Sequence, residues 1–276
     1  MDLDVQDRVV VVLVRARNPG NIGAVARAMH DFGFRRLRVV NEFPVPFEAA
    51  KSAVDASAVL AEAEEFACVA EAVGDCTLVV GTTAVGERDL QHELKLLAEA
   101  APLLRAELQP DPAHDDQAAS DGSNGAGGRR VALLFGSEKT GLSNDELSHC
   151  DWLLTIPMQQ HDGVRHPSMN LGQAVAVCLY ELVRAPQSPQ DPQAYSNEAA
   201  AEPILNPATA ANLERVTALL NEVMAQTGYT RRHAANCDPA HVRRLVRRLG
   251  ADAVDAPVWM GILRQVLWKL GVGRQE

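Results

Sequence analysis

The stretch "RVVVVLVRA", Arg8 to Ala16, constrains the fold of this chain more than any other segment. It is a continuous run of mostly β-branched residues, which is typical of a strand buried on both faces of a parallel sheet. The next segment, Asn18 to Phe34, is predicted to be helical because four apolar residues recur at helical spacing: Ile22, Val25, Met29 and Phe32. A buried strand that leads into a helix is the beginning of an α/β unit.

Strands and helices continue to alternate along the next 150 residues. Further strands are predicted at Arg36–Val40, Cys76–Ala84, Arg129–Glu138 and Trp152–Met158. Helices are predicted within Ala49–Ala72, at Leu90–Leu104 and at Ser168–Ala185. This alternation predicts a parallel α/β sheet with helices on both faces.

Two segments interrupt the pattern and divide the chain. Residues 109–128 are poor in apolar side chains and rich in Asp, Ser, Gly and Ala, which predicts a flexible surface insertion. Residues 186–203 are rich in proline and predict a linker. We therefore expect a sheet domain at residues 1–185 and a small α-helical module at residues 204–276, with helices at Leu213–Thr227, Pro239–Leu249 and Pro257–Leu270.

The composition restricts the class of protein. The 276 residues suffice for one large domain or two smaller ones, and no stretch approaches the ~20 apolar residues of a membrane span. The N-terminus lacks the charged-then-apolar order of a signal peptide. The five cysteines include no CxxC pair, and His161 and His166 lack a third ligand at suitable spacing, so no disulfide framework or metal site is indicated. We expect a cytoplasmic protein without a membrane partner.

The net charge of −10 does not exclude an RNA partner, because the charge is unevenly distributed. The segment from Ile204 to Glu276 contains ten Lys and Arg residues against six Asp and Glu residues, and is therefore basic. The remainder contains 16 basic against 30 acidic residues, and seven of the acidic ones lie in residues 109–128 and 186–203, which contain no Lys or Arg.

The turns after the strands are the candidate ligand site, because ligands bind beyond the carboxyl ends of the strands in an open α/β sheet. One of these turns, "GSEKTGLS", nearly fits a phosphate-binding loop, but Leu142 occupies the position of the essential lysine, which argues against a nucleoside triphosphatase. No GxGxxG follows any strand, which argues against a dinucleotide fold. Four segments are expected at this edge: residues 18–27, 81–83, 135–142 and 156–170.

Several polar residues at this edge have an ordinary structural explanation. Ser143 to Glu146 is a capping box that begins a helix, and Ser168 and Asn170 are by default N-cap residues. Glu138 is either a solvated loop carboxylate or a site residue. Arg27 lies roughly opposite the apolar stripe of its helix, where it either pairs with a carboxylate or serves a site.

Taken in chain order, three segments resemble the motifs of one family. "NPGNIGAVARAMHDFGF", "LLFGSEKTGLSNDEL" and "IPM…SMNLGQAVAV" resemble the three motifs of the SpoU/TrmH class of SPOUT RNA 2′-O-methyltransferases, and the first is most similar to the TrmJ-like tRNA branch. The resemblance covers Arg8 to Arg184. It extends more loosely through the C-terminal helices, where "MGILRQVLWKL" is similar to the helical extension of that branch.

This resemblance implies a C-terminal trefoil knot in the α/β domain, a homodimer, and S-adenosylmethionine as cofactor. By motif position it implies catalytic roles for Asn21, Arg27, Glu138, Ser168 and Asn170. It also implies that the cofactor lies, mostly through backbone groups, against Thr82, Gly136, Ile156 and Leu171. Arg27 would position the nucleotide and stabilise charge on the attacking oxygen rather than act as a base, because the pKa of a guanidinium exceeds about 12.

The implied reaction is methylation of a ribose 2′-hydroxyl in tRNA, in the anticodon loop. Ribosomal RNA is the alternative substrate, a non-catalytic RNA-binding or assembly factor is the alternative class, and DNA is not an expected partner. Two departures from the family's pattern concern specificity. Relatives usually place an arginine directly after the alanine of "GTTA", whereas this chain has Arg88 further on, and the loop at 158–167 is longer than usual.

The C-terminal module contains the segment "HVRRLVRRL", His241 to Leu249. Helical spacing predicts that its four arginines share one face: Arg243, Arg244, Arg247 and Arg248. By pattern alone this is a solvated basic face. In an RNA methyltransferase it is a candidate surface for RNA phosphates.

Overall fold

The computed structural model describes residues 6–41, 58–84, 90–109, 129–159, 168–184 and 206–271. Apart from Gln109, the predicted insertion at 109–128 lies outside these ranges, and so does the predicted linker at 186–203. Arg88, His161 and His166 also lie outside them.

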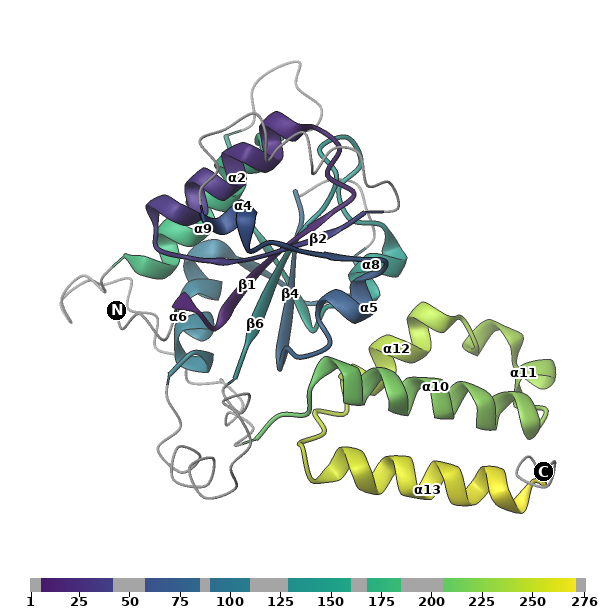
Figure 1. The fold of residues 1–276 in the computed structure, drawn as a ribbon. Coiled ribbons are helices and arrows are strands. Elements are labelled where there is room, and N and C mark those ends of the chain that lie inside the picture. Colours follow the sequence, from purple (N-terminus) through teal and green to yellow (C-terminus); the bar gives the residue numbers. More distant parts are fainter. Residues whose placement is uncertain are drawn as a thin grey trace, which may run out of the picture.

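A parallel sheet in the order β3-β2-β1-β6-β4-β7-β5 forms the centre of the larger part of the molecule (Figure 1). All residues of β1 and β6 are buried, because these strands are central and covered on both faces. The predicted parallel α/β sheet is therefore confirmed. Its strands are β1 (Val9–Val14), β2 (Arg36–Val40), β3 (Glu64–Phe66), β4 (Leu78–Thr82), β5 (Leu94–Leu96), β6 (Val131–Phe135) and β7 (Trp152–Thr155).

Helices cover both faces of the sheet, as predicted (Figure 1). One face carries α2 (Pro19–Asp31), α4 (Ala58–Ala61), α6 (Leu97–Glu107) and α9 (Leu171–Val183). The other carries α5 (Val69–Ala72) and α8 (Asn144–Ser148). Alternate residues of β1 point to the two faces, so that Val11 and Val12 belong to different apolar clusters.

Two short strands lie in segments that were predicted to be helical. β3 lies within Ala49–Ala72, and β5 lies within Leu90–Leu104. Both have three residues, of sequence EEF and LKL, and contain no β-branched side chain. They are held as edge strands by pairing with β2 and β7. Tertiary pairing therefore overrides the local pattern at both edges of the sheet.

The C-terminal module is helical, and its three predicted helices are confirmed. They are α10 (Ala210–Gln226), α12 (Pro239–Arg247) and α13 (Asp255–Lys269), with a short α11 (Tyr229–Arg232) and a 3-10 turn at Ala234–Asn236 between the first two. α10 contacts both α12 and α13 through an apolar cluster that includes Leu213, Val246 and Leu263. No helix in the described ranges is long and apolar enough to cross a membrane.

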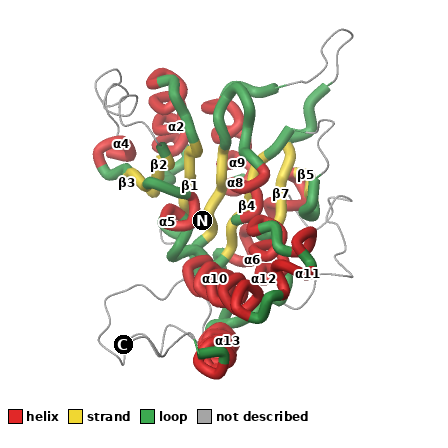
Figure 2. Tube along the Cα trace, turned by 90° about the vertical axis from the view of Figure 1, so that its right-hand side faces the viewer, coloured by secondary structure: helices red, strands yellow, loops and turns green. Residues whose placement is uncertain are grey.

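The module is attached to the sheet domain through α10 and α12, while α13 lies farther away (Figure 2). At the start of α10, the backbone N–H groups of Ala210 and Ala211 donate to the carbonyl oxygens of Cys76 and Gly74, at 2.8 and 3.0 Å. These two acceptors precede β4. The module therefore contacts the end of β4 opposite to the expected ligand-binding edge.

Candidate active site

Three polar side chains from distant parts of the sequence meet at the carboxyl edge of the sheet. Nδ2 of Asn21, in the first turn of α2, donates to Oε1 of Glu138 at 2.7 Å. Oδ1 of Asn21 accepts from Nδ2 of Asn170 at 3.0 Å. The two contacts span 117 and 149 residues of sequence, so the fold, not local sequence, brings the groups together.

Asn170 has the N-cap role that was considered for it. It is the N-cap of α9, because its Oδ1 accepts from the backbone N–H of Gly172 at 2.9 Å. This bond orients the amide so that its Nδ2 faces Asn21. The close approach of α2 and α9 requires glycine at position 172, because a Cβ there would lie 2.7 Å from Cβ of Ala24.

A tight turn after β6 holds Glu138. The backbone N–H of Gly141 donates to the carbonyl oxygen of Ser137 at 2.8 Å, and Gly141 has a φ of +65°. A Cβ on Gly136 would lie 2.2 Å from the carbonyl carbon of Gly141, so only glycine fits there. The side chain of Glu138 is thereby presented at the exposed tip of the turn, next to Asn21.

The helix after this turn begins as predicted. Oγ of Ser143 accepts from the backbone N–H of Glu146 at 3.2 Å, and the carboxylate of Glu146 accepts from the N–H of Ser143 at 2.5 Å. This reciprocal pair is the expected capping box of α8. The capping interpretation of this stretch is therefore confirmed.

Sequence reasoning missed Arg15, which lies directly after β1. Its Nε and Nη2 donate to the two carboxylate oxygens of Glu146 at 2.6 and 2.9 Å, and Nη2 also donates to the carbonyl of Gly141 at 3.0 Å. Arg15 has a φ of +58°, a strained conformation for a residue with a side chain, which costs about 1–3 kcal/mol. It ties the end of β1 to the turn that carries Glu138. No local pattern signals this contact, because its partner lies 131 residues away.

Arg27 is exposed on α2, as helical spacing predicts. Its guanidinium forms no hydrogen bond or ion pair with any residue that the structure describes, so it does not pair with a carboxylate of those ranges. Ser168 is also exposed, and its hydroxyl has no hydrogen-bond partner in the same part of the chain. The resemblance assigns catalytic roles to five residues. The fold joins three of them by hydrogen bonds, whereas Arg27 and Ser168 have no hydrogen-bond partner among the described residues.

Three of the four expected cofactor residues lie at the ends of neighbouring strands, and the fourth begins a helix. Thr82 ends β4, Gly136 follows β6 and Ile156 follows β7, while Leu171 begins α9. Strand register places Leu134 opposite Gly81 and Leu154 opposite Thr82, so these strands end at the same level. The hydroxyl of Thr82 donates to the carbonyl of Leu134 at 2.9 Å.

The chemistry of this edge suits an adenosyl group. Ile156 and Leu171 supply apolar surface that is continuous with the core. The hydroxyl of Thr155 is buried and has no hydrogen-bond partner within the described ranges, so one polar group remains for a ligand. No cluster of three or more His, Cys, Asp or Glu side chains in those ranges is placed to hold a metal ion, and all five cysteines are free thiols.

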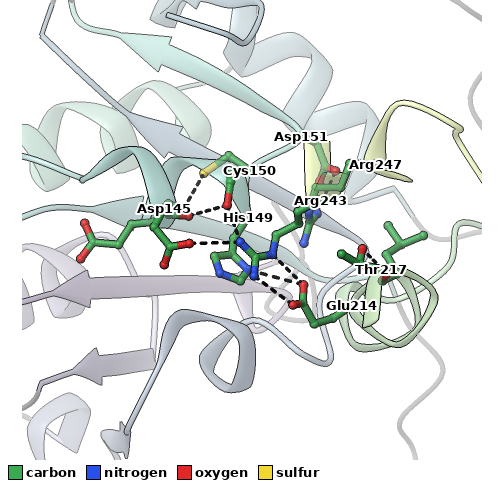
Figure 3. Close-up of polar contacts among 11 residues, drawn as sticks. Asp145, His149, Cys150, Asp151, Glu214, Thr217, Arg243 and Arg247 are labelled. Atoms are coloured by element: carbon green, nitrogen blue, oxygen red, sulfur yellow. Dashed lines mark hydrogen bonds and ion pairs between the residues drawn. The ribbon is translucent and has the colours of Figure 1, made fainter. Parts of the chain in front are cut away.

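Two of the four arginines of α12, Arg243 and Arg247, are engaged by other side chains and do not belong to a solvated basic face (Figure 3). Nε and Nη2 of Arg243 bind the carboxylate of Glu214 at 2.9 and 3.1 Å, and its Nη1 donates to Oγ of Ser148 at 2.6 Å and to Asp145 at 3.3 Å. Nη1 of Arg247 binds Asp151 at 2.9 Å. The side chains of Arg243 and Arg247 are only 14% and 4% exposed.

This docking corrects the expectation that all four arginines are solvated. Arg243 contacts Ser148 at the end of α8, and Arg247 contacts Asp151 directly before β7, so these two side chains are covered. Arg244 is half-buried and Arg248 is exposed. Asp151 is fixed from both sides, because its second oxygen accepts from the backbone N–H of Val79 at 2.8 Å. Arg243 and Arg247 thus join the module to the sheet domain.

His149 lies in the docking cluster, which is formed by Asp145, Ser148, Asp151, Glu214, Arg243 and Arg247, and several of these residues are labelled in Figure 3. Burial, together with the positive charges of Arg243 and Arg247, lowers the pKa of His149 to about 4. The neighbouring carboxylate of Glu214 acts in the opposite direction but does not compensate. The imidazole is therefore neutral at pH 7.

The open parallel sheet, with its polar turns gathered at the carboxyl ends of the strands, defines an α/β protein whose ligand site lies at that edge. The chain matches the SpoU rRNA Methylase family over residues 8–180, more than half of its length. It belongs to this family.

Relatives match almost the whole chain. A protein of Cronobacter sakazakii named tRNA (cytidine/uridine-2′-O-)-methyltransferase TrmJ is 32% identical over 270 residues, which cover 96% of this chain and 97% of that protein. The protein of the same name from Sodalis glossinidius is 30% identical over 257 residues, 93% of this chain and 90% of the relative. The crystal structure of TrmJ from Z. mobilis superposes with a TM-score of 0.68 at 26% identity, over 93% of this chain and 98% of the other.

Proposed function

We propose that this chain is an S-adenosylmethionine-dependent tRNA methyltransferase that modifies a ribose 2′-hydroxyl. The observation that carries the proposal is the hydrogen-bonded chain Glu138–Asn21–Asn170, in which one residue from each of the three family motifs takes part. The named activity of relatives whose alignments cover 90% or more of both chains supports tRNA as the substrate rather than ribosomal RNA.

S-adenosylmethionine would supply an electrophilic methyl group. Thr82, Gly136, Ile156 and Leu171 would hold it, mostly through their backbone groups, at the neighbouring ends of β4, β6 and β7. The unpartnered hydroxyl of Thr155 is a further group that could bind its polar part.

The amides of Asn21 and Asn170 are oriented before any substrate binds. Asn21 uses one N–H on Glu138 and one lone pair on Asn170, so a second N–H and a second lone pair remain for RNA or cofactor. Asn170 is fixed in turn by its bond to Gly172. Groups held in this way lose little freedom when the substrate binds, which favours an in-line approach of the 2′-oxygen.

Arg27 would act on the RNA. The 2′-hydroxyl must lose its proton as it attacks, and a fixed guanidinium stabilises the charge that develops on oxygen. An arginine that has no carboxylate partner among the described residues also remains available to a phosphate. We therefore assign it positioning of the nucleotide and charge stabilisation, not proton abstraction.

The proposal includes the trefoil knot and the homodimer that the resemblance implies. It also includes a methylation target in the anticodon loop and a cytoplasmic location. The proposed domain limits are 1–185 and 204–276. Exposure along the α2–α9 pair supports a subunit contact there. Tyr180 on α9 is 52% exposed although it packs against Phe32, and Arg27 lies exposed on the same pair of helices. Native mass spectrometry tests the dimer directly.

Arg27→Ala tests the mechanism. The variant should keep its circular dichroism spectrum and its calorimetric affinity for S-adenosylmethionine, but lose about 100-fold or more in methyl transfer to tRNA. Arg35→Ala is the matched control, because Arg35 is also exposed and lies just after the same helix. Wild-type turnover in Arg27→Ala would refute the mechanism. A wild-type protein that binds no S-adenosylmethionine would leave the RNA-binding alternative, and mapping of 2′-O-methyl marks separates tRNA from ribosomal RNA.

A further inference from the structure

A pocket of about 330 Å³ lies where the helical module meets the sheet domain. Three segments line it: the residues before β5, the helix α8, and the first turns of α12. None of the candidate catalytic or cofactor residues contributes to it. Its volume lies at the lower end of the range of small-ligand sites, about 300–1,000 Å³.

The walls of this pocket are held together by the docking contacts. Arg243 joins α12 to α8 through Ser148. Arg247 joins α12 to Asp151, and both arginines are labelled in Figure 3. The pocket therefore exists because the module is docked, and a segment of substrate that lies in it would contact both parts of the protein.

Two polar groups in the pocket lack partners. The guanidinium of Arg244 lines the pocket and forms no hydrogen bond or ion pair within the described residues, in contrast to Arg243 and Arg247 on the same helix. Nε2 of His92 is buried and also has no partner there. An unsatisfied buried nitrogen costs about 1–3 kcal/mol, which a ligand that hydrogen-bonds to it would recover.

The charged side chains that line the pocket are of both signs. Asp238, the N-cap of α12, presents its carboxylate at the pocket wall and accepts from the N–H of His241 at 2.8 Å. Asp145 of α8 also lines the pocket, and its carboxylate accepts from Nη1 of Arg243 at 3.3 Å. Burial, together with the positive charges of Arg244, Arg247 and Arg248, lowers the pKa of His92, which favours its neutral form. A phosphate would meet two carboxylates and one guanidinium.

A nucleobase matches the same groups better. Its edge carries both donors and acceptors, for which the pocket offers a guanidinium, a neutral imidazole and carboxylates. Its faces are flat and apolar, and Leu90, Leu147 and Pro239 supply apolar wall. Proteins that read RNA sequence do so mainly on unpaired bases that are splayed out of the chain.

We propose that this pocket binds an unpaired nucleobase of the RNA substrate, at a place separate from the methylated nucleotide, with Arg244 and His92 as its polar contacts. This inference rests on the proposed function, because it takes RNA as the ligand. It makes the docked module a part of substrate selection.

The test compares the affinities of a fluorescein-labelled tRNA transcript for full-length variants, measured by anisotropy. Arg244→Ala and His92→Ala should each weaken binding at least about fivefold, with an unchanged calorimetric affinity for S-adenosylmethionine. Arg264→Ala is the matched control, because Arg264 is an exposed arginine of α13 that does not line the pocket; it should change the affinity less than twofold.

The salt dependence separates a base contact from a phosphate contact. If Arg244 binds a base, the slope of log Kd against log salt concentration stays unchanged in Arg244→Ala. A slope reduced by about 1 would identify a phosphate contact and overturn the proposal. An unchanged tRNA affinity in both pocket variants, with active wild-type enzyme, would overturn it and leave the proposed function intact. Weakened binding with an unchanged slope, in a protein that transfers no methyl group, would instead overturn the proposed function and support the pocket.

Discussion

Replacing Arg243 by alanine should loosen the helical module from the sheet domain. The side chain makes two hydrogen bonds to Glu214, which belongs to its own module, and further bonds to Ser148 and Asp145 of the sheet domain. It is 14% exposed, so water replaces its contacts poorly. The variant removes the charge that holds α12 against α8.

The loss of stability expected in Arg243→Ala depends on how deeply the hydrogen-bond partners of Arg243 are buried. Losing one member of a buried ion pair costs about 3–5 kcal/mol, whereas an exposed pair contributes about 0–1 kcal/mol. Asp145 is 75% exposed and adds little, and Glu214 is 31% exposed, so its unpaired carboxylate is partly solvated. The bond to the buried Oγ of Ser148 is lost as well. We therefore expect a loss of about 2–3 kcal/mol, below the fully buried limit.

Urea unfolding followed by tryptophan fluorescence measures this loss. The three tryptophans report on both parts, because Trp152 lies in β7 and Trp259 and Trp268 lie in α13. With a slope of about 1–3 kcal/mol per molar urea, the transition midpoint should fall by about 1 M, or a separate earlier transition of the module should appear.

Arg248→Ala is the control for Arg243→Ala, because it removes an exposed arginine of the same helix. Its unfolding curve should match that of the wild type. Identical midpoints for the two variants would refute the docking role of Arg243. If Arg243→Ala instead left stability unchanged and reduced the salt dependence of tRNA binding, the side chain would be a phosphate contact, as the sequence pattern alone allows.

Four further substitutions test the turns, α13 and the docking contacts. Gly136→Ala would place a Cβ 2.2 Å from the carbonyl carbon of Gly141, so calorimetry should show loss of S-adenosylmethionine binding. In Gly261→Ala, in α13, the new Cβ meets open space, so the free energy of unfolding should rise by up to about 1 kcal/mol. The pKa of His149 is about 4 in the folded chain and about 6.5 in the unfolded chain, so the unfolded state binds more protons between these values. The free energy of unfolding should therefore fall by at most about 3 kcal/mol from pH 6.5 to pH 4. Urea midpoints should show a smaller fall over this range in His149→Asn. Arg15→Gly suits the φ of +58° but removes the contact to the Glu138 turn, so circular dichroism should stay native while methyl transfer falls at least about tenfold.

The central strands and their helices could be predicted because their signals are local. The valine run gives β1, the spacing of Ile22, Val25 and Met29 gives α2, and β2 has the predicted bounds. The capping box at Ser143 is equally local. By contrast, β3 and β5 are strands only because a neighbouring strand pairs with them, which a window of sequence does not contain.

The candidate site shows the same division between local and long-range information. Spacing placed Arg27 on the exposed side of its helix and Asn170 at a cap. The contacts of Asn21 with Glu138 and Asn170 cross more than 100 residues. The parallel sheet predicted that their segments meet at one edge, but only the family's motifs singled out these residues. The ion pair of Arg15 and the burial of Arg247 depend on which surfaces meet, and no periodicity reports that.

The carboxylate of Asp151 has a consequence for the order in which the protein assembles during synthesis. One of its oxygens is already held by the backbone of β4, a segment that leaves the ribosome well before α12. N-terminal parts of a chain generally fold first as it emerges. The sheet can thus position the carboxylate of Asp151 before Arg247 is synthesised, so the last helices dock on a surface that has already folded.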